Sequence, residues 1–172
     1  MKYLIVNTLP QAVEEVEQAI SELSQALYIA EVIHTEGLKI HGCIGCNDCW
    51  LKTPGICTIQ DDYQQLLINF LQVDRVLFIA ETRRGFVSYQ MKDILDRILP
   101  LATMYLKFCN GQMRHYSRYK KQTDMGILIT GDGDLEYLNT WMDRVMLNLH
   151  AESLGVYELC CRKELCHALG NR

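Results

Sequence analysis

The sequence has few of the features that mark disordered, membrane-embedded or nucleic-acid-binding proteins. It contains 3 prolines among 172 residues, no low-complexity segment, and no apolar run of membrane-spanning length. Its net charge is −4, and no basic run is longer than Lys120–Lys121. These absences predict one globular domain, residues 1–172, with no membrane partner and no nucleic-acid partner.

We also expect no secretory signal at the N-terminus, because the apolar run Tyr3–Val6 is too short to serve as one. We therefore expect a cytoplasmic protein. The chain nevertheless contains 8 cysteines. Structural disulfides are rare in a reducing compartment, so metal binding or redox chemistry is the better interpretation of cysteines that are grouped.

Four cysteines form such a group. Cys43, Cys46, Cys49 and Cys57 follow the spacing C-x2-C-x2-C-x7-C. Thiolates two residues apart can turn toward one centre, and Pro54–Gly55 favours a turn that brings Cys57 back to the other three. Four interpretations remain open: ligands of a [4Fe–4S] cluster, ligands of zinc, a reversible disulfide or reactive thiol, and unliganded cysteines that shape the loop.

The other candidate residues have structural explanations. The remaining cysteines show no comparable spacing, and we expect small apolar residues in or near the core. They are Cys109, Cys160, Cys161 and Cys166. We expect His41 to lie in solvent, and Asp61 with Gln64 matches a capping box at a helix start. No residue order indicates hydrolase or kinase chemistry.

Short apolar runs alternate with longer runs of helical spacing. The expected strands are 2–7, 28–34, 75–80, 125–130 and 153–159. The expected helices begin near Gln11, Asp62, Ser88 and Asp134, the third continues to Leu99, and a short last helix ends at Gly170. We expect the basic and aromatic stretch 114–121, which lies within the long polar segment 107–123, to be a solvated loop.

This alternation predicts an α/β fold, a doubly wound five-stranded parallel sheet of order 2-1-3-4-5 with helices on both faces. Arg75–Ala80 is apolar on both faces, as a central parallel strand must be. In such sheets ligands bind beyond the carboxyl ends of the strands. The loops that should share this edge are 8–11, 41–60, 82–88 and 131–134.

The cysteine loop and its flanks resemble those of a known family. Cys43–Cys57, followed by Asp61–Asp62, resembles the cysteine loop of the flavodoxin-like NADPH-dependent FMN reductases, in particular the branch that includes the iron–sulfur flavoproteins. Residues 74–101 resemble the same family's third strand, isoalloxazine loop and following helix. The resemblance covers most of the chain, and the cysteine loop is specific to that branch.

The resemblance implies FMN at the carboxyl edge of the sheet and NAD(P)H as electron donor. The phosphate would lie in the first loop, near Thr8, and the ring would lie against the loops after the third and fourth strands. A glycine there lets the backbone approach a flat ring, and an arginine stabilises the anion of a reduced flavin. The implied ring contacts are Thr82, Arg83, Arg84, Gly85, Phe86, Thr130 and Gly131.

The first loop, Asn7–Gln11, departs from the family pattern. Relatives carry serine, glycine and a basic residue there, because these groups hold a phosphate. This loop has neither glycine nor a cation, and Glu14 and Glu15 follow in the first helical turn, where they repel a dianion. Three outcomes remain open: weak FMN binding, phosphate contacts from elsewhere, or loss of the cofactor.

The sequence thus predicts an FMN-dependent oxidoreductase that passes electrons to a small-molecule or protein acceptor. No catalytic side chain is expected, because hydride transfer to flavin requires stacking and alignment. The resemblance implies a homodimer or homotetramer. The alternative is a flavodoxin-like protein that has lost flavin binding and serves as a thiol redox sensor or binding module.

Overall fold

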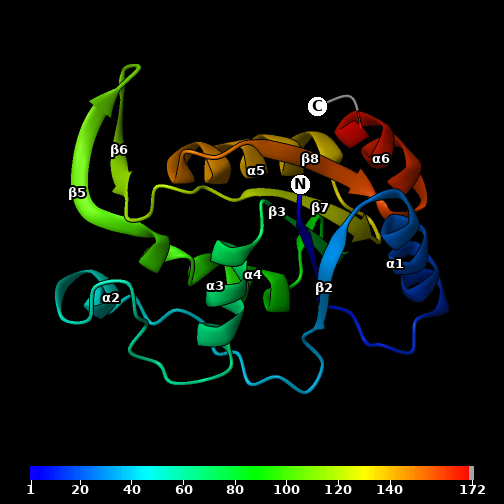
Figure 1. Ribbon diagram of the computed structural model, residues 1–172, viewed down its shortest axis with the longest axis horizontal. Helices are drawn as coiled ribbons and strands as arrows, with labels where there is room; N and C mark the ends of the chain where they lie inside the picture. Colours follow the sequence, from blue (N-terminus) through cyan, green and yellow to red (C-terminus); the bar gives the residue numbers. More distant parts are fainter. Residues whose placement is uncertain (171–172) are drawn as a thin grey trace.

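Five strands form the central parallel sheet of the computed structural model, which describes residues 1–170 (Figure 1). Their order is β2-β1-β3-β7-β8, and each neighbouring pair is parallel, which confirms the predicted order. The strands are β2 Ile29–His34, β1 Tyr3–Asn7, β3 Arg75–Arg83, β7 Asp124–Thr130 and β8 Ser153–Glu158. Asn171 and Arg172, which the predicted domain includes, lie outside the described residues.

Helices cover both faces of the sheet, as expected (Figure 1). Side chains alternate along a strand, so Leu4 and Val6 of β1 join one core while Tyr3 and Ile5 join the other. The helices of the first core are α3 Tyr63–Gln72, α4 Tyr89–Asp96 and α5 Leu135–Leu149. Those of the second core are α1 Glu14–Ala26 and α6 Arg162–Gly170.

Helix α4 ends at Asp96, before the predicted Leu99. Arg97 leaves the helical conformation, with φ −93° and ψ 8°, and the chain continues into a 3₁₀ turn, Leu99–Leu101. This turn contains Pro100, which has no N–H to extend an α-helix. The early end turns the Arg97 side chain into the protein, where it is 1% exposed.

A second sheet includes residues 114–117 of the stretch 114–121, so the prediction of a solvated loop is wrong for these residues. Strands β5 Ala102–Cys109 and β6 Gln112–Ser117 pair antiparallel and rise as an arm at the left of Figure 1. Asn110 and Gly111 join them with φ of 50° and 76°, the conformation that a two-residue type I′ hairpin requires. The Asn-Gly pair was therefore a local hairpin signal within a segment of polar composition.

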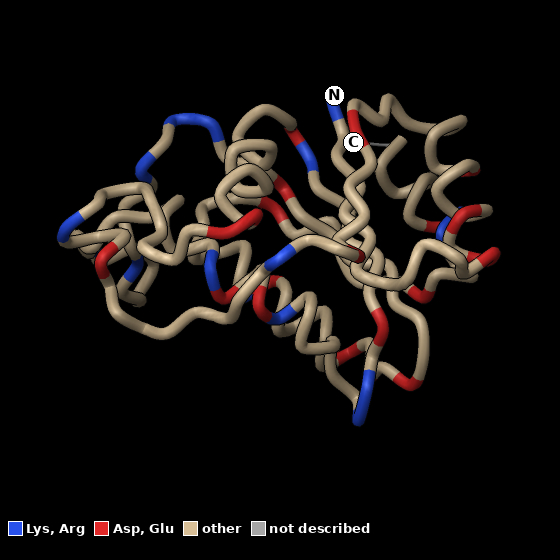
Figure 2. The backbone as a smooth tube through the Cα atoms, turned by 90° about the horizontal axis from the view of Figure 1, so that it is seen from below, with Lys and Arg blue, Asp and Glu red and all other residues tan. Residues whose placement is uncertain are grey.

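No helix among residues 1–170 is long and apolar enough to cross a membrane. Lysine and arginine positions are spread over several parts of the chain rather than gathered on one element (Figure 2).

The two cores generate a stability prediction. Phe78 lies in the centre of β3 and is 0% exposed, so Phe78→Ala should lower the free energy of unfolding by about 3–5 kcal/mol. Phe108 on the hairpin arm is 74% exposed, and Phe108→Ala should change it by less than about 1 kcal/mol. Urea unfolding measures both values. Equal losses in the two variants would contradict the exposure of the arm.

Candidate redox site at the carboxyl edge of the sheet

The cysteine loop connects β2 to α3 and contains one short helix, α2 Asp48–Leu51. The predicted turn at Pro54–Gly55 is present: the Ile56 N–H donates to the Thr53 carbonyl at 2.8 Å, and Gly55 has φ 89°. The Gly55 N–H also donates to the Cys49 carbonyl, which folds the second half of the loop onto the first. The backbone of the loop is thus ordered by its own hydrogen bonds.

The four loop cysteines lie close enough to influence one another. Burial raises the pKa of the Cys49 thiol, and the charges of Cys57, Cys43 and Cys46 raise it further. Cys49 is buried, Cys57 is half-buried, and Cys43 and Cys46 are exposed. The thiols are not gathered as tightly as ligands of a single ion, because no three of them, among the described residues, lie within 4.8 Å of one another. An iron–sulfur cluster is larger than one ion and holds its thiolates farther apart.

Arg97 ties the two ends of this loop together. Its Nη1 donates to the His41 carbonyl at 3.0 Å and to Asp61 Oδ2 at 2.6 Å, and its Nη2 donates to the Ile59 carbonyl at 3.2 Å. The guanidinium also lies over the ring of Tyr63, 4.4 Å from its centroid. One side chain at the end of α4 therefore joins the stretch of the loop at His41 to the stretch at Ile59 and Asp61 that precedes α3.

Asp61 is the acidic partner in this network. Burial alone would raise the pKa of its carboxyl, but hydrogen bonds from Arg97 and from the backbone and ring of His41 lower it to about 2. The expected capping box does not form, since Asp62 is the N-cap residue and makes no side-chain capping bond. The His41 ring is exposed, as expected, but its Nδ1 lies 3.0 Å from Asp61 Oδ2.

Two buried polar atoms beneath the loop have no hydrogen-bond partner among the described residues, namely Tyr63 Oη and Arg97 Nε. Tyr63 is 0% exposed, and burial raises the pKa of its phenol, with the charges of Cys57 and Cys43 acting in the same direction. Burial opposes the charge of Arg97, but Asp61 and Cys57 outweigh it and raise the pKa of the guanidinium. Unsatisfied donors beside thiols suit an anionic sulfur-rich group, so these residues fit a [4Fe–4S] cluster.

The predicted ring-binding loop is a tight hairpin. β3 pairs antiparallel with β4, Phe86–Val87, and Arg84 and Gly85 form the turn between them with φ of 54° and 78°. Arg83 is exposed, and its Nε lies 3.0 Å from Glu81 Oε2. Phe86 packs against the ring of Trp141 in α5, with centroids 4.8 Å apart. The arginines therefore extend from the edge of the sheet, while Phe86 anchors the hairpin.

The loop after β7 meets this hairpin, as the sequence predicts for a shared edge. Thr82 Oγ1 donates to the Thr130 carbonyl at 2.8 Å. Gly131 has φ 96°, and a side chain there would place its Cβ 2.9 Å from the Thr82 carbonyl oxygen. The close approach requires glycine at this position. Flavin contact by these residues stays a prediction.

The first loop does not fit a phosphate dianion. The N–H and the hydroxyl of Thr8 both donate to the Ile79 carbonyl, at 2.9 and 3.0 Å, and the residue is buried. The Gln11 N–H donates to Glu36 Oε2 at 2.8 Å, so a carboxylate of the chain itself satisfies the donor. Sequence reasoning identified the missing cation and missed Glu36. The predicted contact between Thr8 and the phosphate thus gains no support from this geometry.

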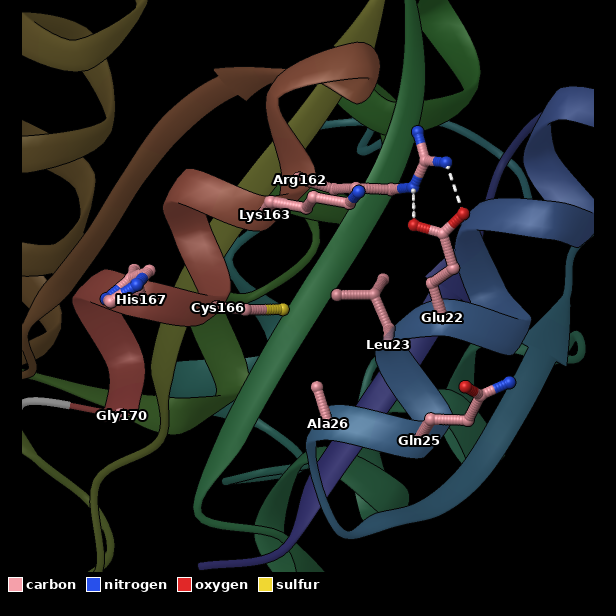
Figure 3. Close-up of a pocket in the computed structure, with 9 residues that line it drawn as sticks. All are labelled: Glu22, Leu23, Gln25, Ala26, Arg162, Lys163, Cys166, His167 and Gly170. Carbon is pink, nitrogen blue, oxygen red and sulfur yellow. Dashed lines mark hydrogen bonds and ion pairs between the residues drawn. The ribbon is translucent and has the colours of Figure 1, made fainter.

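A separate groove of about 810 Å³ lies between α1 and α6 (Figure 3). Arg162 and Glu22 close one end of it through two hydrogen bonds of 2.9 and 2.7 Å. None of the predicted site residues lines this groove. The ribbon places these helices at the opposite end of the molecule from α2 (Figure 1).

The network of Arg97 and Asp61 generates a pH prediction. The folded-state pKa of about 2 lies below the ordinary 3.8, so the stabilisation by Asp61 is fully present above about pH 4 and is lost as the pH falls toward 2. The shift corresponds to about 2 kcal/mol in the free energy of unfolding. Urea unfolding at several pH values should show this loss in the wild type and not in Asp61→Asn.

At pH 7, Asp61→Asn should cost about 3–5 kcal/mol, because it leaves Arg97 buried without its counter-ion. The matched control is Asp132→Asn in an exposed loop, which should unfold like the wild type. A wild-type pH profile in Asp61→Asn would show that the carboxylate does not hold the loop.

Comparison with known proteins gives partial sequence matches and full-length structural ones. The chain is 31% identical over 86 residues to an iron–sulfur flavoprotein of Methanocaldococcus jannaschii, a match that covers 50% of this chain and 44% of the relative. An iron–sulfur flavoprotein of Archaeoglobus fulgidus is 32% identical over 84 residues, covering 49% of this chain and 37% of the relative. These matches span less than half of each relative's length. No family model matches the chain.

The solved structure of an NAD(P)H:quinone oxidoreductase from Methanothermobacter marburgensis superposes with a TM-score of 0.63 and 17% identity. This superposition covers 98% of the present chain and 95% of that protein, so the agreement extends over the whole fold. About half of the chain is therefore similar in sequence to iron–sulfur flavoproteins, and the described structure has the same flavodoxin-like α/β fold as that quinone oxidoreductase.

Proposed function

We propose that this protein is an oxidoreductase that carries electrons from a reduced nicotinamide donor to a small-molecule or protein acceptor, with a [4Fe–4S] cluster on the cysteine loop. The observation that carries the proposal is the anchored loop. The four thiols influence one another, and two buried donors near Cys57, Tyr63 Oη and Arg97 Nε, have no partner among the described residues. The names of the relatives, iron–sulfur flavoproteins, support the same assignment.

The cluster would supply one-electron transfer, and the residues around it would control that transfer. Arg97 places a fixed positive charge beside Cys57, which favours the thiolate ligand and the added electron. Asp61 orients the guanidinium through the 2.6 Å bond to Nη1. Cys43 and Cys46 are exposed, so a partner can approach the site from solvent.

Flavin is the second cofactor in the proposal. A nicotinamide gives up two electrons as a hydride and a cluster accepts one, so a flavin is the chemical group that connects them. The name of the quinone oxidoreductase with the same fold supports the nicotinamide donor. FMN in particular stays a prediction, because the first loop does not fit its phosphate.

The closed first loop favours a second candidate function. Thr8 is hydrogen-bonded to Ile79 and Gln11 to Glu36, so these groups of the loop are satisfied without a phosphate. Such a loop is expected in a protein that has lost flavin binding. The exposed thiols of Cys43 and Cys46 would then act as a redox sensor. The cytoplasmic location and the homodimer or homotetramer stay predictions under both functions.

Iron binding tests the cluster. Cys49→Ser removes one of four ligands, so iron and sulfide content after anaerobic reconstitution should fall at least several-fold. The control, Cys109→Ser on the hairpin arm, should bind as much iron and sulfide as the wild type. The visible spectrum of protein purified without oxygen distinguishes cluster, flavin, both and neither. A wild type that takes up neither iron nor flavin would leave the sensor as the remaining function.

Flavin affinity tests the first loop. Glu36→Ala removes the carboxylate from the Gln11 N–H, and it should tighten FMN binding about two- to five-fold. Riboflavin, which has no phosphate, should bind unchanged. Fluorescence titrations with both flavins measure the difference, and Glu164→Gln on α6 is the control for the loss of one surface charge. An equal change for both flavins would exclude the electrostatic explanation.

A further inference from the structure

Three potential metal ligands converge in the turn that follows β8, away from the four loop cysteines. The Cys160 thiol donates to Glu158 Oε2 at 3.4 Å, and its sulfur lies 3.8 Å from that of Cys161. Among the described residues, these three form the one group of three or more such ligands whose ligand atoms all lie within 4.8 Å of one another. The expectation of a small apolar residue in or near the core is wrong for Cys160, which is exposed, whereas Cys161 is half-buried.

The distances between these ligand atoms match the distances between neighbouring ligands of a tetrahedral metal ion. Two thiolates bound about 2.3 Å from zinc stand about 3.8 Å apart, and a thiolate and a carboxylate oxygen stand about 3.6 Å apart. The distances between Cys160 Sγ and its two neighbours, 3.8 and 3.4 Å, are close to these values. A soft ion could therefore enter with little movement of the ligands.

A disulfide between the two thiols fits less well. Bridged cysteines usually have Cα atoms about 4.4–6.8 Å apart, whereas adjacent residues joined by a trans peptide are about 3.8 Å apart. No cis peptide bond is present among the described residues. The pair is therefore better suited to remain a dithiol and bind a metal.

The turn that carries these residues is fixed by its neighbours. Glu158 is the last residue of β8 and pairs with Ile129 of β7, and Leu159 is buried in the core beneath α1 and α6. Arg162 Nη1 donates to the Leu159 carbonyl at 3.1 Å, while its other nitrogens bind Glu22 of α1, as Figure 3 shows. Preorganised ligands of this kind lose little entropy on binding an ion.

We propose that Glu158, Cys160 and Cys161 bind a thiophilic divalent cation of the zinc type. The three side chains supply two sulfur ligands and one oxygen ligand. The exposure of Glu158 and Cys160 leaves the fourth position open to water or an external ligand. The site is independent of the cysteine loop and of the proposed cluster.

Zinc stoichiometry of the full-length chain tests the proposal. Equilibrium dialysis against zinc should find one fewer ion per chain in Cys160→Ser and in Cys161→Ser than in the wild type. The control Cys109→Ser should bind the wild-type number. Glu158→Gln keeps the shape of the side chain but removes its charge, so the affinity of this one ion should fall on the order of ten-fold or more. The matched control for that charge is Glu164→Gln.

Site-resolved thiol labelling keeps the test valid if a variant folds poorly. In the wild type, zinc should slow maleimide labelling of Cys160 and Cys161, and a chelator should restore it, with each cysteine read by peptide mapping. The loop cysteines are read separately, so zinc bound there does not interfere. Equal labelling of Cys160 and Cys161 with and without zinc, or an unchanged number of bound ions in both serine variants, would overturn the proposal.

Discussion

The buried ion pair between Arg97 and Asp61 is the constraint on which the candidate redox site depends. Its two side chains are 0% and 3% exposed, so both charges are removed from water at a cost that only close pairing and further hydrogen bonds offset. The carbonyls of His41 and Ile59 supply those bonds, and both belong to the cysteine loop. The loop is therefore held by the requirement that Arg97 be neutralised and hydrogen-bonded.

This constraint explains how an exposed, largely irregular loop can be ordered. The turn at Pro54–Gly55 orders the middle of the loop, while Arg97 joins its two flanks to the end of α4. Arg97 Nε and Tyr63 Oη have no partner among the described residues, and Cys57 lies near enough to raise the pKa of both side chains. Leaving such donors unpaired is costly, which favours a group with sulfur acceptors at this position.

The first loop, Asn7–Gln11, is instead closed by hydrogen bonds within the chain. A phosphate site needs free N–H groups and positive charge, and here the chain bonds its own groups instead, through Thr8 with Ile79 and Gln11 with Glu36. The carboxyl edge thus combines an anchored cysteine loop with a closed phosphate loop. The sequence resemblance implies both a cysteine loop and an FMN phosphate site at this edge, whereas the structure supports the first better than the second.

The sequence by itself determined the strand order and the shared edge of the loops, because these follow from the alternation of strand-like and helical apolar patterns. It also determined the turn that brings Cys57 back, because Pro54–Gly55 sets the local backbone conformation. The Asn110–Gly111 hairpin was also encoded locally, although the polar composition around it favoured a loop. Only the tertiary structure decided the partners of Arg97, which lie 36 and 56 residues away at Asp61 and His41. It likewise decided that Glu36 occupies the Gln11 N–H, 25 residues distant. Such choices are set by which side chains the packed sheet brings within hydrogen-bond distance, and no local pattern contains that information.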